Sequence, residues 1–266
     1  MASVINFFKI HDKHAIENFL REDPMIHLYE IGDLDDFFWP QTRWIALASG
    51  EDLISILLLY EDFRMPVLLA LNHKPLPLVM NGTLLLKNLL PSHLNAHLSP
   101  GFKDLLKQVY HVESSGLHHK MGLSDFSSIR NKEFSKVIRL DMGNCNELLE
   151  LYRISYPGNW FHEKMLQTGQ YYGIKINNQL VSVAGVHVYS EKYRVAALGN
   201  ITTHPKFRNR GLAETVTACL CDQLATRADH IGLNVHSENL SAIRCYQKLG
   251  FRIISQFEEC RLISRK

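Results

Sequence analysis

The sequence predicts an α/β protein with a mixed sheet, in which an antiparallel meander connects to a parallel strand through a crossover helix. The meander consists of three apolar runs: 171–176, 180–189 and 193–203. Asn177-Asn178 lies between the first two runs and favours a β-hairpin. The apolar positions of 214–224 recur with a helical period, and another apolar run, 231–235, follows. A helix between two strands is typical of a parallel connection.

The first part of the chain is predicted to begin with two helices followed by three strands. Asp12 can cap a helix in which Ile16 and Leu20 share an apolar face, and a second short helix is expected within 28–38. The three strands are expected at 43–48, 53–60 and 67–71, the first two as a hairpin.

Two more helices are predicted before this region ends. One covers 81–90. The other begins after Ser99, with Pro100 in its first turn, and carries one apolar face: Phe102, Leu105, Leu106, Val109 and Tyr110. His93 and His97 are four residues apart and could share a helix face, as some metal ligands do. Because no carboxylate accompanies them, we interpret them as exposed histidines.

A domain boundary is predicted in the polar stretch 124–132, which has no clear hydrophobic period. It separates an N-terminal α/β region, 1–130, from a second domain, 136–266. With 266 residues, 46% of them apolar, the chain is long enough for two ordinary domains.

The second domain is predicted to open with a strand at 136–140 and two helices. Asn144 and Glu147 have the spacing of a capping box for the first helix, and 160–166 forms the second. The elements expected after the strand 231–235 are a helix at 239–249, with Gly250 at its C-cap position, and strands at 251–258 and 261–264.

The basic segment 201–213 is predicted to be the turn between the last strand of the meander and the crossover helix. The start of a helix presents unpaired backbone N–H groups and a positive dipole end. Arg208 and Arg210 add two full charges, and Gly211 lets a ligand approach the backbone. These features together predict a pyrophosphate site.

This segment resembles the acyl-CoA signature of the GNAT superfamily of N-acetyltransferases, through the order Arg208-x-x-Gly211-x-Ala213. A second match follows the strand 231–235 and comprises Asn239, Tyr246 and Gly250-Phe251. The resemblance covers roughly 136–266 and implies the GNAT fold for that domain. The long N-terminal region is similar to the branch that includes glycine N-acyltransferases. Its element order suggests a diverged half-copy of the same fold, which is an argument from analogy.

The resemblance implies acetyl-CoA as co-substrate and no metal. The residues that it assigns to the cofactor are Ile201, Thr202, Thr203, Arg208, Asn209, Arg210, Gly211, Leu212, Ala213 and Asn239. It makes Tyr246 the general acid that protonates the departing thiolate. The general base stays open among His187, His236, Glu238 and a water chain. Trp160 and Phe161 are candidates for the acceptor pocket or for the core.

The function implied is transfer of an acetyl group from acetyl-CoA to a primary amine, which belongs to a small molecule or a peptide. The alternatives are a different acyl donor, glycine as the acceptor, and a non-catalytic acyl-CoA-binding sensor. Tyr246 distinguishes an enzyme from a sensor, because only an enzyme has turnover to lose when this residue is changed.

Composition argues against several other classes of protein. The 29 Lys and Arg residues against 27 Asp and Glu give a net charge of +2, so neither a nucleic-acid nor a membrane-surface partner is expected. The five cysteines are odd in number and scattered, which argues against a disulfide framework. Because we identify no signal peptide or membrane span, we expect a cytoplasmic protein, and a homodimer stays open.

Overall fold

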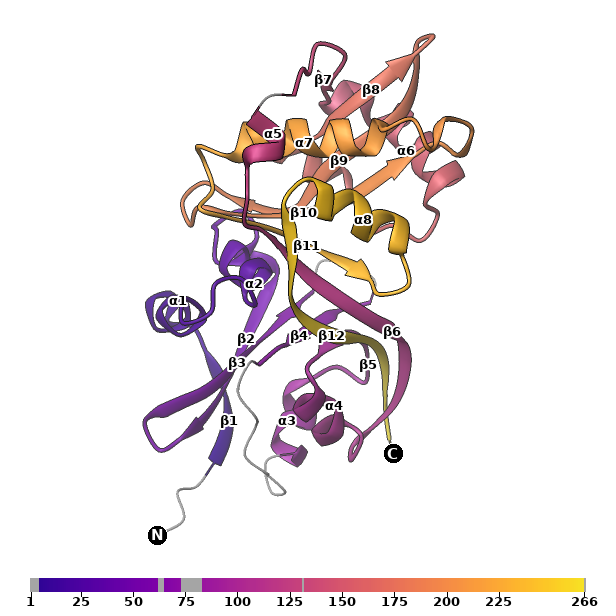
Figure 1. The fold of residues 1–266 in the computed structure, drawn as a ribbon. Helices are drawn as coiled ribbons and strands as arrows, with labels where there is room; N and C mark the ends of the chain where they lie inside the picture. The colour runs from indigo at the N-terminus through magenta and orange to yellow at the C-terminus, as the bar shows by residue number, and fades with distance from the viewer. Residues whose placement is uncertain (1–4, 62–64, 73–82, 131, 266) are drawn as a thin grey trace. The chain divides into compact units, whose positions relative to one another are not determined.

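A computed structural model describes residues 5–61, 65–72, 83–130 and 132–265 (Figure 1). The chain forms two compact units. The first unit contains Met1–Lys120 together with Ile254–Lys266, and the second contains Met121–Ile253. The predicted mixed α/β class is confirmed, because each unit combines helices with parallel and antiparallel strand pairs. The predicted domain limits, 1–130 and 136–266, stay a prediction.

The first unit is a mixed sheet with helices. Its elements are β1 (Ile5–Ile10), α1 (Lys13–Leu20), α2 (Leu28–Asp33), η1 (Trp39–Gln41), β2 (Thr42–Ser49), β3 (Asp52–Tyr60), β4 (Val67–Ala70), α3 (Thr83–Leu89), β5 (His93–Leu98), α4 (Pro100–Leu106) and β6 (Tyr110–Leu123). Its strands follow the order β1-β2-β3-β4-β5-β12-β6, where β12 is Phe251–Ser264. Strands β4 and β5 are parallel, whereas β12 is antiparallel to β5.

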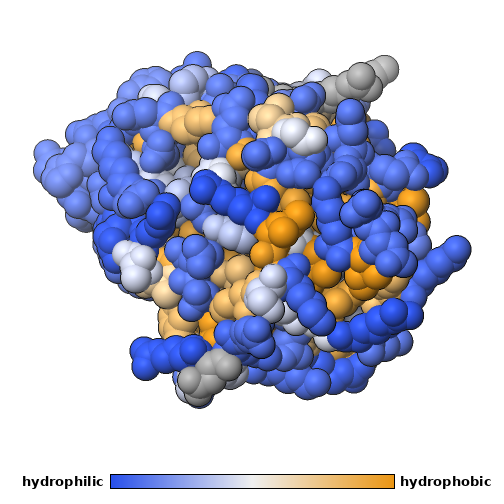
Figure 2. Space-filling view, turned by 90° about the horizontal axis from the view of Figure 1, so that it is seen from above, coloured by the Kyte–Doolittle hydropathy of each residue, from blue (hydrophilic) through white to orange (hydrophobic). Residues whose placement is uncertain are grey.

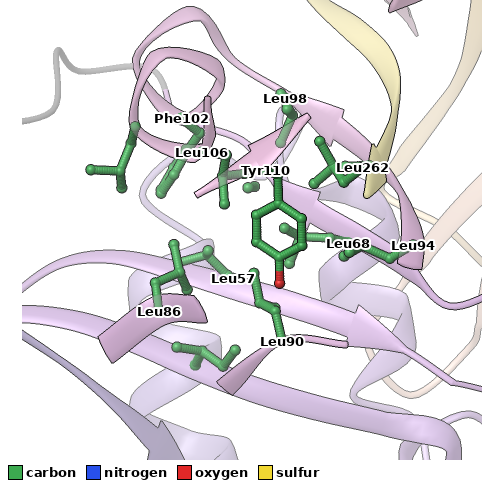
Figure 3. Close-up of a cluster of buried hydrophobic side chains, with 14 of the residues drawn as sticks. Leu57, Leu68, Leu86, Leu90, Leu94, Leu98, Phe102, Leu106, Tyr110 and Leu262 are labelled. Carbon is green, nitrogen blue, oxygen red and sulfur yellow. The ribbon is translucent and has the colours of Figure 1, made fainter. Parts of the chain in front are cut away.

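The core of the first unit gathers leucine side chains from distant parts of the chain (Figure 3). Leu57 and Leu68 come from the sheet, Leu86 from α3, and Leu262 from the closing strand β12. Tyr110 is fully buried among them, and its hydroxyl donates to the Pro91 carbonyl at 2.9 Å. The last residues of the chain therefore complete the core of its first unit.

In the first unit, the predictions that depend on a few neighbouring residues are confirmed. The Asp12 carboxylate accepts from the N–H groups of His14 and Ala15, as expected for the cap of α1. The β2–β3 hairpin and the strand β4 are also present. Strand β1 has no counterpart in the predictions, although it pairs with β2 from Ile5↔Ser49 to Ile10↔Trp44.

Two predictions in the first unit are wrong. The helix expected to carry Val109 and Tyr110 ends at Leu106, and Tyr110 begins the 14-residue strand β6. His93 and His97 lie in the strand β5, not on a helix. The apolar residues of 93–98 alternate with polar ones, and this period of two is typical of a strand.

The second unit repeats the combination of sheet and helices. Its elements are α5 (Ser127–Arg130), β7 (Ile138–Arg139), η2 (Met142–Asn144), α6 (Cys145–Ser155), η3 (Glu163–Thr168), β8 (Tyr172–Ile176), β9 (Gln179–Ser190), β10 (Val195–Thr203), η4 (Pro205–Phe207), α7 (Leu212–Leu224), β11 (His230–His236) and α8 (Leu240–Lys248). Its strands follow the order β11-β10-β9-β8-β7. Strands β10 and β11 are parallel, and the other pairs are antiparallel.

The hairpin and crossover predicted for the second unit are confirmed. Asn177 and Asn178 both have positive φ, 52° and 61°, as the tight turn between β8 and β9 requires. Helix α7 connects β10 to the parallel strand β11 and packs against β8, β9 and β10. The predicted helix 239–249 corresponds to α8, and Gly250 follows it with φ of 94°.

Three details of the second unit differ from prediction. The capping box lies one turn earlier, between Asp141 and Asn144, because the Asn144 side chain accepts from the Asp141 N–H at 3.2 Å. The segment 160–166 is not a helix throughout, since the 3₁₀ helix η3 starts only at Glu163. The two expected closing strands are one strand, β12, which runs without a break.

Both units contain three antiparallel strands followed by a helix, a parallel strand and a further helix. This order agrees with the interpretation of the first unit as a diverged half-copy, which stays an interpretation. Figure 2 shows one face of the molecule, where hydrophilic side chains predominate and apolar side chains reach the surface between them. Within the described ranges, no helix is long and apolar enough to cross a membrane.

Candidate functional site

Two neighbouring strands of the second unit, β10 and β11, form a fork. Strands β10 and β11 pair only from Val195↔His230 to Leu198↔Leu233, although β10 continues to Thr203 and β11 to His236. On its other side β10 stays paired with β9 as far as Thr203↔Ser182. The β11-facing edge of 199–203 can therefore bind an extended ligand as an added strand.

A β-bulge in β10 lies inside this fork. The register with β9 shifts between Gly199 and Thr202, and Asn200 has a positive φ of 54°. Bulges re-aim side chains and are frequent beside active sites. Residues Ile201, Thr202 and Thr203 follow the bulge on the unpaired stretch, where the resemblance places them.

A turn with an exposed helix start follows the fork. The first hydrogen bond of α7 runs from the Thr215 N–H to the Gly211 carbonyl at 3.0 Å. The N–H groups of Leu212, Ala213 and Glu214 therefore lie outside the helical hydrogen-bond ladder. Gly211 has φ of 73°, and a Cβ there would meet no atom within 4 Å, so the space beside it is open. Asn209 is left-handed as well, with φ of 61°.

Positive charge surrounds this helix start. Arg208 and Arg210 are exposed; the Arg208 Nε donates to the Thr203 carbonyl at 3.3 Å, and the Arg210 guanidinium lies 5.1 Å from the centre of the Phe207 ring. Glu214 carries the only acidic side chain in the first turn of α7, and Lys132 pairs with it at 2.6 Å. This ion pair offsets a carboxylate that would otherwise repel an anion at the same turn.

Tyr246 and Asn239 belong to α8, which follows β11. The Asn239 side chain accepts from the Ala242 N–H at 3.2 Å and so caps the helix. Tyr246 is buried, and its ring centre lies 6.0 Å from that of Phe251. Burial raises the pKa of the Tyr246 phenol above its usual range, which keeps the hydroxyl protonated at neutral pH.

The three candidate bases have different surroundings. The His187 ring occupies the space beside Gly199, where a Cβ would lie 1.9 Å from its Cδ2. Burial lowers the pKa of His187 to about 4. His236 and Glu238 share a turn after β11, in which the Glu238 N–H donates to His236 Nδ1 at 3.2 Å.

The sequence-based predictions named Phe161 as a pocket candidate but not the two tyrosines that pack against it, Tyr152 and Tyr171. Phe161 packs against Tyr152 and Tyr171, with ring centres 5.1 and 5.7 Å away, so it is a core aromatic as well as a pocket candidate. Tyr171 covers Gly185, which is paired with Gly199 across the sheet. The two glycines inside apolar strand patterns were the available signal, because such a glycine indicates a close approach of another group.

The geometry separates the predicted site residues into two groups. The cofactor residues of 201–213 lie along one continuous path, from the unpaired edge of β10 through the turn to the start of α7. Asn239 and Tyr246 lie on α8, where Asn239 is exposed and Tyr246 is buried. Among the described residues, no group of three His, Cys, Asp or Glu side chains could hold a metal ion.

Comparison with known proteins finds a family match for part of the chain. The model of the acetyltransferase (GNAT) family matches residues 138–251. No curated protein matches the sequence. Among solved structures, a GNAT-family protein from Novosphingobium aromaticivorans is 19% identical with a TM-score of 0.64, and the match covers 91% of this chain and 99% of that one.

Two further solved structures resemble the chain over nearly its full length. A Drosophila protein is 11% identical with a TM-score of 0.70, covering 97% of this chain and 98% of that one. A tandem GNAT protein from the clavulanic acid biosynthesis pathway is also 11% identical, with a TM-score of 0.57 and coverage of 97% and 98%. At these identities, the similarity shows the fold.

Proposed function

We propose, from the premise that residues 138–251 carry an acetyltransferase (GNAT) domain, that the protein is an N-acetyltransferase that moves the acetyl group of acetyl-CoA to a primary amine. The observation that carries the proposal is the fork between β10 and β11, which leads directly into the basic turn before α7. An extended arm with a pyrophosphate at one end matches both parts of this path.

Each part of acetyl-CoA has a proposed position along this path. The pantetheine arm pairs with the free edge of Ile201, Thr202 and Thr203. The pyrophosphate accepts hydrogen bonds from the backbone of 208–213, and Arg208 and Arg210 contribute charge. Asn239 lies beside the arm while it caps α8. The thioester then lies within the fork.

The proposed reaction is direct attack on the thioester. The amine nitrogen forms a bond to the thioester carbonyl carbon, and the carbon–sulphur bond breaks. The nitrogen loses one proton and the thiolate of CoA gains one, so the products are an N-acetyl amide and the free thiol. Tyr246, which stays protonated at neutral pH, is the proposed donor to the thiolate.

The lowered pKa of His187 favours another route for the proton of the acceptor. A primary ammonium with a pKa near that of lysine, about 10, lies about 6 units above His187, which corresponds to about 8 kcal/mol for a direct transfer. We therefore assign the proton to a water chain that leads to the turn of His236 and Glu238. The acceptor is a small molecule or a peptide, and we expect a cytoplasmic protein without nucleic-acid or membrane partners.

Calorimetric titration with acetyl-CoA tests the binding part of the proposal. We expect Arg210→Glu to weaken binding by about tenfold or more, because a charge-assisted contact to phosphate is replaced by repulsion. Arg153→Glu is the matched control, since Arg153 is exposed on α6 and the same charge is reversed there. Equal affinity in the wild type and Arg210→Glu would contradict the proposed position of the pyrophosphate.

Thiol release with a panel of amines tests the catalytic part. We expect Tyr246→Phe to lose most of the turnover while it keeps its affinity for acetyl-CoA, because the substitution removes one hydroxyl and keeps the ring. A wild-type protein that binds acetyl-CoA but releases no thiol with any amine would instead be an acyl-CoA sensor.

A further inference from the structure

Asn200 holds the central position in the fork. It lies two residues beyond Leu198, the last residue of β10 that pairs with β11. Its backbone is left-handed, and only 2% of its surface is exposed. A buried polar residue in this conformation persists only where its surroundings hold it.

Contacts from three elements hold Asn200 in place. Tyr152 of α6 donates its hydroxyl proton to the Asn200 carbonyl at 2.9 Å. The Asn200 side-chain nitrogen lies 3.0 Å from the Tyr171 hydroxyl and 3.4 Å from the Met165 sulphur. These contacts fix both the backbone and the side chain of the residue.

The same contacts decide which way the amide faces. The Tyr171 hydroxyl has one proton, and its acceptors are the Val186 carbonyl at 3.0 Å and the more distant Met165 sulphur at 3.5 Å. The hydroxyl can then only accept from Asn200, so the NH₂ group of the amide must face Tyr171. The amide oxygen Oδ1 is thereby directed away from Tyr171.

Oδ1 of Asn200 is buried, and within the described parts of the chain no group donates to it. An unsatisfied buried acceptor costs about 1–3 kcal/mol, and most buried polar atoms have a partner. The neighbouring edge of β10 is the stretch that β11 leaves unpaired. A ligand in the fork that presents an N–H group would satisfy this oxygen.

We propose that Asn200 determines specificity for the acceptor by accepting, through Oδ1, a hydrogen bond from the attacking amine. This inference rests on the proposed acetyl transfer. A neutral primary amine has two N–H bonds, so one can point to Oδ1 while the lone pair points to the thioester carbon. An alkoxide or thiolate has no hydrogen to donate, so this hydrogen bond favours an amine over an oxygen or sulphur nucleophile that attacks in its deprotonated form.

Pantetheine also carries amide N–H groups. The experiment must therefore distinguish whether Oδ1 accepts from the acceptor amine or from pantetheine. Asn200→Gly removes Oδ1 but tolerates the left-handed backbone and keeps the carbonyl that Tyr152 contacts. Tyr171→Phe removes the anchor of the amide and leaves Oδ1 present.

Steady-state kinetics with an amine that the wild type acetylates, together with titration of acetyl-CoA, give the two readouts. We expect Asn200→Gly to raise KM for the amine about tenfold, the value of one hydrogen bond, with an unchanged Kd for acetyl-CoA. Tyr171→Phe should lie between the wild type and Asn200→Gly. A parallel rise in the Kd for acetyl-CoA would assign Oδ1 to pantetheine and overturn the proposal. An unchanged KM would leave Asn200 with a structural role alone.

A second experiment tests the role of Asn200 if the proposed acetyl transfer does not occur. If no amine releases thiol, the test becomes binding of ethylamine to the CoA-bound protein, followed through the ¹⁵N signal of the Asn200 side chain. Tetramethylammonium is the control, because it is a small cation like protonated ethylamine but has no hydrogen-bond donor. A shift with ethylamine alone supports the inference without the reaction, and no shift overturns it.

Discussion

The pKa of His187 depends on the absence of a side chain at Gly199. Gly199 has no Cβ, and the His187 ring fills the vacant space on the paired strand. Burial there disfavours the imidazolium and lowers the pKa from 6.5 to about 4. The residue that the sequence offers as a base is therefore neutral at physiological pH and a weak proton acceptor.

This pKa shift predicts a pH dependence of stability. Between pH 4 and 6.5 the unfolded chain binds the proton and the folded chain does not, so stability rises with pH through this window. The contribution is fully present above pH 6.5, is lost as the pH falls to 4, and amounts to at most about 3 kcal/mol. Urea unfolding across this range should give a flatter profile for His187→Gln, and His111→Gln, at an exposed site, should keep the wild-type slope. Identical slopes for His187→Gln and the wild type would refute the assignment.

At the scale of elements, the turn between β10 and α7 needs a glycine for two reasons, its left-handed backbone and the proposed approach of a ligand. Gly211 needs left-handed backbone to start α7, and the open space beside it is where the pyrophosphate is proposed. Gly50, in the turn between β2 and β3, has the same backbone requirement, with φ of 63°, and the same open space. Comparing substitutions at Gly211 and Gly50 therefore distinguishes the cost of backbone strain from the loss of a ligand contact.

Replacing each glycine by alanine gives the prediction at this scale. Both Gly211→Ala and Gly50→Ala should lose about 1 kcal/mol of unfolding free energy, because each places a Cβ in left-handed backbone. Only Gly211→Ala should weaken acetyl-CoA binding, since its methyl group occupies the space beside the helix start. Chemical denaturation and calorimetry measure the two effects. Equal acetyl-CoA affinity in both variants would exclude close approach of the ligand at Gly211.

At the scale of the whole molecule, the end of the chain belongs to its first unit. Strand β12 pairs with β5 from Glu258↔Leu98 to Ile263↔His93, and Leu262 lies fully buried in the core of that unit (Figure 3). A segment more than 150 positions after β5 thus contributes to the same hydrophobic core. Residues far apart in the sequence therefore build this core together.

The prediction at this scale concerns Leu262. Leu262→Ala should cost about 2–5 kcal/mol of unfolding free energy, as expected for a large-to-small change in a packed core. Arg261→Ala, which changes the exposed neighbour, is the control. Hydrogen exchange should accelerate in β2, β3 and β5 with Leu262→Ala. Faster exchange confined to β8–β11 would contradict the placement of β12 in the first unit.

The sequence by itself determined the features that a short segment encodes. The cap at Asp12, the turn at Asn177-Asn178 and the glycine before α7 depend on a few neighbouring residues, so their conformations follow from local sterics and hydrogen bonding. The order of the acyl-CoA motifs likewise survives in the linear sequence, and the family match at 138–251 agrees with it.

Only the tertiary structure decided where strands part and which ones pair. The last β10–β11 pair at Leu198, the place of β12 beside β5 and the orientation of the Asn200 amide all depend on groups far apart in the chain. Strand pairing is a non-local choice, because the period of two in a strand specifies its faces but not its neighbour. The basic turn before α7 could therefore be predicted from the sequence, and its phosphate-binding role stays a prediction, whereas the Asn200 amide proposed to select the acceptor became visible only in the fold.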